Sequence, residues 1–496
     1  MAFQMKLVDE FIPSKYQKDI FNFIKHGTGN GVINAVAGSG KTTTLLKALN
    51  YIPSDKKIVF CAFNKHIATE LKEKAPENVW STTLHGAGMR SMMMSKHHPT
   101  VDMYKQNTIF DQILKYDRTE IKEINNGYFQ QSEIESNYFY SVRDAVDMMK
   151  ASMLPENTDS LRQVVDFYDL DMGPNQRLFE FFVFKSMQLS AQHPEVINFS
   201  DMIWLPLKLK LYIPQFDYVF IDELQDLNMA QIELALKMCN DTGRIIGAGD
   251  PFQSLYGFMG AAPDAMDKTT ARINAITLPL SISYRCPTSH IKLAQTYVPY
   301  IEASPTATAG AVFNINGEEF LNVIKPGDMV ICRNNAPLIE YAFLALEKGY
   351  KVNIRGRDIG HGLMTIVKKA KVTTIPQLEQ KLHVWKASEI EKALREKKNP
   401  NRIEDKYKAL MVLCSKAKTP SQLIDYIREL FSDTNQEIVF SSVHRAKGME
   451  SKRVFIIQFN LIPCRWAKQA WEMEQERNIA YVAVTRSKEE LYFVGK

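Results

Sequence analysis

A glycine-rich segment near the start of the chain carries the residue types that bind phosphate. Residues 35–43 read Ala-Val-Ala-Gly-Ser-Gly-Lys-Thr-Thr, after a short apolar run. Gly38 and Gly40 would let backbone N–H groups close on phosphate oxygens at the positive end of a following helix. Lys41 would reach the β- and γ-phosphates and the Thr42 hydroxyl would bind Mg²⁺, which favours a nucleotide site over an ordinary glycine turn. The residues predicted to hold the phosphates and their ion are Ala37, Gly38, Ser39, Gly40, Lys41, Thr42 and Thr43.

Two adjacent acids at the end of a later apolar run would complete such a site. Residues 218–226 read Tyr-Val-Phe-Ile-Asp-Glu-Leu-Gln-Asp. Asp222 would hold the metal ion, and Glu223 would orient and deprotonate the attacking water. Adjacent side chains on a strand point to opposite sides, so one acid can face the metal and the other the γ-phosphate. Acids in this place can also cap a helix, but beside a phosphate loop they favour hydrolysis of Mg-ATP.

The elements that position these residues follow from the recurrence of short apolar, β-branched runs. Many of these runs precede turn residues and then a helical periodicity, which predicts an α/β fold with largely parallel sheets. The runs fall into one group before about residue 275 and one group after it, at 31–36, 57–62, 218–221, 244–248, 329–332, 438–441, 454–457 and 491–494. Helix-like stretches after residue 85 and after residue 357 interrupt the two groups, so each α/β unit is expected to carry one helical insertion.

Length and composition narrow the class of protein. The 496 residues correspond to roughly three or four domains, and 45% hydrophobic with 24% charged residues is typical of globular proteins. No apolar run is long enough to span a membrane, and the N-terminus lacks the apolar core of a signal peptide. The six cysteines are scattered without a C-x-x-C pair, which disfavours a zinc site, an iron–sulfur cluster or a disulfide framework. These features predict a cytoplasmic protein without a membrane partner.

Charge is unevenly distributed along the chain. The net charge is +5, yet residues 368–418 alone hold fourteen Lys or Arg and six Asp or Glu, which is +8 and leaves −3 for the rest. This basic run predicts either a surface that faces nucleic acid or a solvated helical face, and by itself favours the second.

Further motifs follow in a fixed order along the chain. Beside the acidic motif at 222–226, residues 249–261 read Gly-Asp-Pro-Phe-Gln-Ser-Leu-Tyr-Gly-Phe-Met-Gly-Ala. The other motifs lie at 16–21, 62–68, 83–86, 198–203, 283–287, 332–334, 443–450 and 476–486. This collinear set resembles the UvrD/Rep/PcrA-like branch of superfamily 1 DNA helicases.

The resemblance implies a specific domain layout. Two RecA-like parallel-sheet P-loop domains are expected, each with an inserted, mainly helical subdomain. The first RecA-like domain would comprise 1–87 and 197–276 around an insertion at 88–196. The second would comprise 277–356 and 437–496 around a basic insertion at 357–436, which is smaller than its counterpart in the family.

The resemblance also assigns roles around ATP. Arg285 and Arg486 would be arginine fingers that reach the γ-phosphate from the second domain. Gln253 would sense the γ-phosphate and link it to the segment that contacts DNA. The adenosine would be bound by Gln17, Tyr284 and Glu450, through the adenine edge, stacking and the ribose respectively.

Binding of a single strand requires aromatic side chains beside groups that contact phosphates. In the family, aromatic residues at three of these motif positions stack on bases, and hydrogen-bonding residues lie near them. Because stacking reads every base alike, little sequence preference is expected. The residues that match are Phe63, Asn64, His85, Tyr256, Phe258 and His444.

The implied function is an ATP-dependent DNA helicase that translocates 3′→5′ on single-stranded DNA and unwinds duplexes with Mg-ATP. The expected partners are single-stranded DNA and single-strand/duplex junctions, with single-strand-binding, replication or repair proteins, and the expected state is a monomer. Two alternatives remain: a translocase that mainly displaces proteins from DNA, and a non-catalytic single-strand-binding scaffold. A joined nuclease has no supporting carboxylate–lysine cluster.

Overall fold

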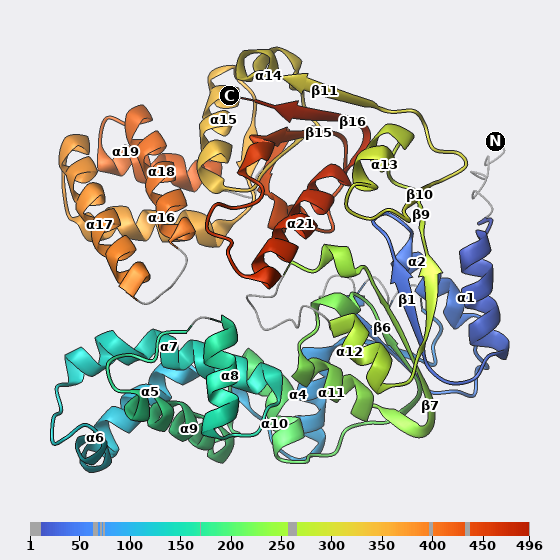
Figure 1. Ribbon diagram of the computed structural model, residues 1–496, viewed down its shortest axis with the longest axis horizontal. Helices are drawn as coiled ribbons and strands as arrows, with labels where there is room; N and C mark the ends of the chain where they lie inside the picture. Colours follow the sequence, from blue (N-terminus) through green and yellow to red (C-terminus); the bar gives the residue numbers. More distant parts are fainter. Residues whose placement is uncertain are drawn as a thin grey trace, which may run out of the picture.

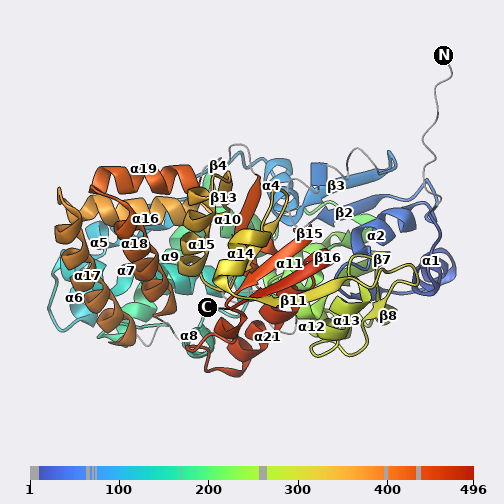
Figure 2. The same cartoon turned by 90° about the horizontal axis from the view of Figure 1, so that it is seen from above.

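The computed structural model describes residues 11–62, 68–69, 72, 75–168, 170–255, 265–395, 400–431 and 437–495. Within these ranges the chain forms two α/β units, lobe 1 and lobe 2, and each unit is interrupted by a helical insertion (Figure 1). The two lobes lie together in one half of the molecule, and the two insertions face each other in the other half. The view from above shows the same division along the long axis (Figure 2).

Lobe 1 is built on a six-stranded parallel sheet with the strand order β3-β2-β6-β7-β1-β8. Its strands are β1 (Gly31–Ala35), β2 (Ile58–Ala62), β3 (Val79–Thr83), β6 (Phe216–Ile221), β7 (Cys239–Gly249) and β8 (Ile276–Leu280). Strand β2 is buried at every residue, as expected for a parallel strand with both faces covered. The carboxyl ends of parallel strands meet at one edge, so β1, β6 and β7 deliver their following loops to the same place.

Helices cover both faces of this sheet. One face carries α1 (Lys15–His26) and α2 (Lys41–Leu49), and the other carries α4 (Leu84–Met94), α10 (Phe199–Lys208), α11 (Met229–Lys237) and α12 (Ala265–Arg272). On β1, Ile33 packs into the first layer and Val32 into the second, since successive strand residues point to opposite faces. Two short 3₁₀ turns, η1 (Leu224–Asp226) and η2 (Pro251–Gln253), follow β6 and β7.

The first insertion is a helical bundle with its own core. Its elements are β4 (Thr100–Val101), α5 (Lys105–Tyr116), α6 (Arg118–Ile124), α7 (Gln131–Ser152), α8 (Thr158–Tyr168), α9 (Gln176–Gln192) and β5 (Val196–Ile197). A buried charged cluster joins it to lobe 1, because Asp201 of α10 accepts hydrogen bonds at 2.7 Å from both Lys105 and Lys150. All three side chains are at most 4% exposed. Removing Asp201 would leave both buried lysines without a counter-charge, so the cluster holds the insertion on α10.

The chain leaves lobe 1 after β8. This strand pairs in parallel with β1 along its whole length, from Gly31↔Ile276 to Ala35↔Leu280. The first sheet therefore extends beyond residue 276, where the sequence predicted the end of the first domain. Strand β8 reads Ile-Thr-Leu-Pro-Leu, is mostly exposed and lies at the sheet edge, the place in a sheet where a proline such as Pro279 is tolerated.

Lobe 2 repeats the architecture. Its parallel sheet has the order β11-β16-β15-β12-β14-β13, with β11 (Ala311–Ile315), β12 (Met329–Cys332), β13 (Val352–Ile354), β14 (Ile438–Ser442), β15 (Ser451–Ile457) and β16 (Ser487–Val494). One face packs on α13 (Thr288–Ala294), α20 (Val443–Ala446) and α21 (Ala470–Val484), and the other on α14 (Gly317–Val323) and α15 (Asn335–Glu347). The small pair β9 (Ile282–Ser283) and β10 (Glu302–Ala303), and the turn η4 (Phe459–Leu461), complete the lobe.

The second insertion consists of α16 (Arg357–Ala370), α17 (Ile375–Arg395), α18 (Asn401–Lys416) and α19 (Pro420–Leu430). It shares one continuous hydrophobic core with the sheet of its lobe, in which Leu410 and Leu413 join Ile339 and Phe440. The core of the first insertion, by contrast, includes residues of the lobe 1 helices α4 and α10 but none of the lobe 1 sheet. Asp405 of α18 also accepts hydrogen bonds at 2.9 Å from the first N–H groups of α15, at Asn335 and Ala336. The insertion is thus packed on lobe 2 as a fixed layer.

The α/β fold with two parallel sheets is as the sequence predicted. All eight apolar runs singled out in the sequence became central strands, four in each sheet. The four strands outside that set, β3, β8, β11 and β13, are the edges of the two sheets, where partial exposure admits polar residues. Across the described residues, none of the helices has the length and apolar character needed to cross a bilayer.

Candidate active site

The phosphate-binding segment joins β1 to α2 at the edge where lobe 1 meets lobe 2. Gly38 and Gly40 have φ angles of 71° and 74°, a left-handed region that suits glycine. A side chain at Gly38 would also collide with lobe 2, because its Cβ would lie 2.5 Å from the Cβ of Arg285. The Ser39 hydroxyl is buried without a hydrogen-bond partner. A loop of this shape with an unsatisfied buried hydroxyl fits a phosphate group, which would supply the missing acceptor.

A hydroxyl and a carboxylate lie together at the start of α2. The Thr42 hydroxyl donates a hydrogen bond of 2.7 Å to Asp222, whose carboxylate is 1% exposed at the end of β6. Burial and the neighbouring Glu223 raise the pKa of Asp222 above its usual range. A buried carboxylate beside a hydroxyl is the oxygen donor set that Mg²⁺ prefers together with substrate phosphates. The residues present therefore fit the ion that the sequence predicted.

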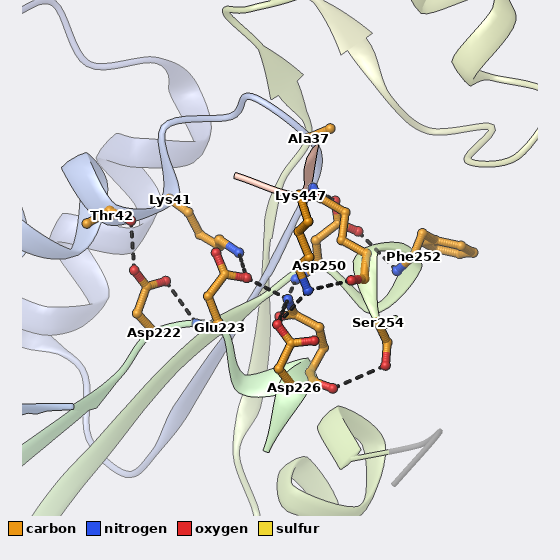
Figure 3. A network of polar contacts seen from close by, with 12 residues as sticks. Ala37, Lys41, Thr42, Asp222, Glu223, Asp226, Asp250, Phe252, Ser254 and Lys447 are labelled. Atoms are coloured by element: carbon orange, nitrogen blue, oxygen red, sulfur yellow. Dashed lines mark hydrogen bonds and ion pairs between the residues drawn. The ribbon is translucent and has the colours of Figure 1, made fainter. Parts of the chain in front are cut away.

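Lys41 and Glu223 form an ion pair at the centre of the site, with 2.7 Å between Nζ and Oε2 (Figure 3). Burial opposes the charge on each group, but the pairing outweighs it. The carboxylates of Glu223, Asp222 and Asp250 raise the pKa of Lys41, while Lys41 and Lys447 hold the pKa of Glu223 below its usual range. Glu223 is thus an ionised carboxylate at neutral pH, as a group that accepts a proton from water must be.

A second ion pair lies next to the pair of Lys41 and Glu223, and this one connects lobe 2 to lobe 1. Lys447 of lobe 2 donates to Asp226 at 2.5 Å and to the backbone carbonyl of Gln253 at 2.5 Å. The side chains of Lys447 and Asp226 are 8% and 0% exposed. Gln225 extends the network, because its amide nitrogen donates to Glu223 at 2.5 Å and to Asp226 at 3.3 Å. Figure 3 shows Lys447 reaching down to this group from above.

A hydroxyl of lobe 2 touches both the phosphate loop and the segment after β7. The Tyr481 hydroxyl accepts a hydrogen bond from the Ala37 N–H at 2.9 Å and donates to Asp250 at 3.4 Å. Asp250 in turn accepts from the Gln253 side chain at 2.6 Å. Burial raises the pKa of Asp250 to about 6. Asn478, three residues before Tyr481 on α21, donates to the Ser254 carbonyl at 3.0 Å.

The two predicted arginine fingers lie at the same seam. Arg285 lies against Gly38 and forms an ion pair with Glu450 at 2.6 Å. Arg486 is fully buried, and its guanidinium lies 3.5 Å from the side-chain oxygen of Gln253. Burial and the charge of Arg285 lower the pKa of Arg486 to about 9. Arg285 thus lies at the phosphate loop and Arg486 lies at Gln253, and the catalytic role of both remains a prediction.

The residues predicted to bind adenosine are placed unequally. Tyr284 is 48% exposed, and its backbone N–H donates to the Gly38 carbonyl at 2.9 Å, so its main chain lies at the loop. Gln17 is 3% exposed and caps α1, with its amide nitrogen also donating to Thr44 at 3.0 Å. Thr43 is exposed on α2. Adenine recognition by Gln17 and ribose binding by Glu450 would each require an exchange of the present partner, and both stay predictions.

The predicted DNA contacts can be followed only in part. Phe63, Asn64, Tyr256 and Phe258 lie outside the described residues. His85 begins α4 and meets the ring of Phe199 edge-on at 5.8 Å, and Phe199 is 52% exposed. Burial lowers the pKa of His85, and burial together with Arg333 lowers that of His444 to about 3. Both imidazoles are therefore neutral at pH 7 and can serve as hydrogen-bonding groups only.

Sequence reasoning assigned no role to Tyr481, Lys447, Asp250 or Phe199. Each lies inside a motif that was recognised, at 476–486, 443–450, 249–261 and 198–203. The signal in the sequence that could have indicated a role for them was a polar or aromatic residue within a motif whose other residues are mainly hydrophobic core. Tyr481 shows the difficulty, because the residues around it, Ile479 and Val482, are buried core residues.

Comparison with known sequences decides the family. The UvrD/REP helicase N-terminal domain family matches residues 16–274, more than half of the chain. The chain belongs to the UvrD/REP helicase family. The UvrD-like helicase C-terminal domain family matches residues 437–494, which contain β14 to β16 and α21. The two matches thus include the lobe 1 side of the seam and, from lobe 2, Lys447, Tyr481 and Arg486 of this UvrD/REP family member, whereas Arg285 lies outside both.

Individual relatives of this family member are distant. A probable DNA helicase II homolog of Mycoplasma pneumoniae is 21% identical over 323 residues, which cover 58% of this chain and 43% of that protein. The ATP-dependent DNA helicase PcrA of Staphylococcus aureus is 25% identical over 262 residues, 48% of this chain and 33% of that protein. The chain thus spans less than half the length of either relative. A solved arterivirus nonstructural protein 10 helicase aligns with 97% of this chain and 61% of its own, at 12% identity and a TM-score of 0.33.

Proposed function

We propose that this UvrD/REP family member is an ATP-dependent helicase that moves 3′→5′ on single-stranded DNA and separates duplexes. The observation that carries the proposal is the seam itself. The phosphate loop of lobe 1 lies against Arg285 and Tyr481 of lobe 2, so nucleotide bound there would touch both lobes. A site divided in this way couples hydrolysis to relative motion of the lobes.

The residues that would hold Mg-ATP are those of the loop and the acids beside it. The backbone N–H groups of 37–43 and Lys41 would bind the phosphates, and Thr42 with Asp222 would hold the ion. The bound ion would neutralise charge on the phosphates and so ease cleavage of the terminal bond. Tyr284 is exposed and its main chain is bonded to the phosphate loop, so its ring would be available for stacking by a base.

Hydrolysis would depend on Glu223 and on the arginines. Glu223 is ionised and would take the proton from the attacking water. For this, Lys41 must exchange Glu223 for the phosphates, which releases the carboxylate. Arg285 and Arg486 would stabilise the charge that develops on the γ-phosphate, a contribution of about 10³- to 10⁵-fold in related phosphoryl transfers.

Coupling to DNA would run through Gln253 and the lobe 2 groups that hold it. Its side chain touches Asp250 and lies beside Arg486, while its carbonyl accepts from Lys447. Gln253 lies three residues before the predicted DNA segment at 256–258. Release of phosphate would change these contacts and so change the grip on the strand. His85, Phe199 and His444 would contribute further contacts by stacking or hydrogen bonding.

The proposal includes single-strand/duplex junctions as the substrate and a cytoplasmic monomer as the working unit. Single-strand-binding, replication or repair proteins would be its partners. The polarity is proposed from the motif resemblance described above.

ATPase and unwinding measurements test the proposal. We expect single-stranded DNA to stimulate ATP hydrolysis, and Glu223→Gln to lower that stimulated rate by about 10²- to 10⁴-fold, the range for a lost general base. Glu318→Gln, an exposed acid on α14, serves as the matched control and should leave the rate unchanged. Preference for a 5′-tailed over a 3′-tailed duplex would overturn the polarity. Displacement of a bound protein without strand separation would identify a translocase instead.

A further inference from the structure

A large groove lies between the two insertions, and none of its lining residues belongs to the nucleotide site. It has a volume of about 1560 Å³. One wall is α7 of the first insertion, with Tyr140 and Ser136, and the other is formed by α16, α17 and α18 of the second insertion. Figure 1 shows α7 running below these helices. Small-molecule sites occupy about 300–1,000 Å³, so the size of this inter-insertion groove indicates an extended ligand.

The charge of the groove indicates an anionic ligand. Among its described lining residues, Asp171 and Glu389 are acidic, against six basic residues. The basic residues are Lys369, Lys371, Lys381, Lys392, Arg402 and Lys406. All six are exposed, and all belong to the basic run at 368–418. The run is therefore not spread evenly around the helices, and a substantial part of it faces one concave surface. A cleft lined by one sign of charge concentrates ligands of the opposite sign.

Exposed apolar side chains lie among these cations. Val384 is 68% exposed and Tyr140 is 57% exposed, and Trp385 lines the groove between them while half-buried. On α17, most of the lining residues recur every three or four positions, so one helix face is mainly presented to the groove; they include 377, 380, 381, 384, 385, 388, 389 and 392. Aromatic and apolar side chains interleaved with lysines are the pattern that binds a single strand, through base stacking and phosphate contacts.

A duplex fits this pattern less well. Its bases are stacked inside, and its outer surface offers mainly phosphate and sugar to a protein. It would pair with the lysines but would leave Val384, Trp385 and Tyr140 facing phosphate. An acidic peptide would satisfy the charge, but it carries no planar surface to stack on Tyr140 and Trp385. A single strand offers both chemistries at once.

We propose that the inter-insertion groove binds a single strand of nucleic acid. If the chain is a helicase as proposed above, this strand is the one displaced from the duplex, because none of the groove-lining residues belongs to the motifs predicted to hold the translocated strand. The walls of the groove belong to different lobes: α7 is fixed on lobe 1 and α16–α18 are packed on lobe 2. Relative motion of the lobes therefore changes the width of the groove and alternately holds and releases the displaced strand.

Charge reversal at matched positions tests the proposal in the full chain. Lys369→Glu with Lys406→Glu removes two groove cations, on α16 and α18. Lys368→Glu with Lys408→Glu makes the same change in net charge on the same helices, at exposed positions outside the groove. We expect the groove pair to weaken binding to a fork with two single-stranded arms by about tenfold, and the control pair by less than twofold. The slope of log affinity against log salt should fall by about 1.4, from about 0.7 per lost phosphate contact.

The substrate series separates the possible ligands. A 3′-tailed duplex without a second arm should bind the wild-type protein and the groove variant equally well. Equal weakening on this substrate and on the fork would assign the groove to duplex DNA and overturn the proposal. Equal behaviour of the groove pair and the control pair on the fork would overturn it as well.

Crosslinking locates the strand directly. The photocrosslinker p-benzoylphenylalanine at position 384 should attach to the displaced arm of a fork, whereas the same group at Leu394, which is 54% exposed on α17 outside the groove, should not. Attachment only to the duplex or to the translocated arm would overturn the proposal, as would loss of attachment on addition of polyglutamate but not of single-stranded DNA. ATPase measurements distinguish the two proposals. If DNA stimulates ATP hydrolysis but the displaced arm does not crosslink, only the proposed role of the groove is contradicted. If DNA does not stimulate ATP hydrolysis by the wild-type protein, the proposed helicase function is contradicted.

Discussion

The two lobes present opposite charge to the seam between them. Lobe 1 places four carboxylates around Lys41, namely Asp222, Glu223, Asp226 and Asp250. Lobe 2 contributes three cations, Arg285, Lys447 and Arg486. The electrostatic balance of the site therefore exists only when both lobes contribute.

The pKa shifts show that burial disfavours the charged forms of acids in lobe 1 and of an arginine in lobe 2. Burial raises the pKa of Asp226 to about 6 and that of Asp250 to about 6. On the other side, burial and the neighbouring Arg285 lower the pKa of Arg486 to about 9. Lys447 stabilises the charged form of Asp226, and nucleotide phosphates that would face Arg486 would stabilise its charged form in the same way. Under the proposed function, lobe 1 would hold the metal ion and the phosphate loop, and lobe 2 would add cations for the charge on the γ-phosphate.

The largest effect is expected from removing a lobe 2 cation next to the phosphates. Arg285→Gln or Arg486→Gln should lower the DNA-stimulated ATPase rate by about 10³-fold or more, because one of the two guanidinium groups that would stabilise the charge on the γ-phosphate is then missing. Steady-state kinetics measures the rate, and a fluorescent ATP analogue measures binding, which should change far less. Arg428→Gln, at an exposed pair on α19, is the control. A rate within tenfold of the wild type in both finger variants would contradict the division of roles between the lobes.

A smaller effect is expected from breaking the ion pair that bridges the lobes. Lys447→Gln leaves Asp226 buried without its cation, and such a loss costs about 3–5 kcal/mol in a buried pair. Because closed lobes would be less populated, the ATPase rate should fall about ten- to hundredfold. Combining the change with Asp226→Asn removes the unpaired charge and should recover part of the loss. Purely additive effects of the two substitutions in a double-mutant cycle would show that the pair is not coupled.

Tyr481→Phe should change the pH dependence more than the maximal rate. Asp250 has a pKa raised to about 6, and its ionised carboxylate accepts the hydrogen bonds from Gln253 and Tyr481 more strongly than the protonated acid, so activity should rise with pH through about 6. Loss of the hydroxyl donor destabilises the carboxylate and moves this limb to higher pH. We expect a several-fold loss at pH 6 and less than threefold at pH 8, measured as kcat. Tyr350→Phe, within lobe 2, is the control; a loss independent of pH would contradict the role of Asp250.

The smallest effect is expected at an exposed pair between the same two lobes. Lys15 of lobe 1 and Glu302 of lobe 2 are 3.6 Å apart, with side chains 65% and 42% exposed. Exposed pairs contribute about 0–1 kcal/mol, so Lys15→Ala should change the ATPase rate by less than twofold. An effect as large as that of Lys447→Gln would break the comparison, because contact between the lobes rather than buried charge would then control closure.

Much of this site could be predicted from sequence because its key residues lie in continuous motifs. The loop at 35–43 and the acids at 222–226 each combine a strand with a turn, and local order is enough to specify both. The central strands were predictable for a similar reason, since burial on both faces demands continuous apolar runs.

The remainder depends on contacts between distant parts of the chain. Tyr481 finds the Ala37 N–H across 444 positions, and its own surroundings are those of a buried helix. Strand β8 is held by pairing with β1 rather than by its composition, so the sequence placed the end of the first domain too early. The groove between the insertions could not be foreseen either, because a basic run specifies charge but not the wall that faces it.

The core shared by lobe 2 and the second insertion has a consequence for engineering. Excision of residues 357–436 would strip the aliphatic cover from Ile339 and Phe440 and remove the carboxylate of Asp405 from the start of α15. The truncated protein would expose a broad hydrophobic surface and aggregate. This segment is a structural necessity of its lobe, and it cannot be cut away or exchanged as a detachable regulator.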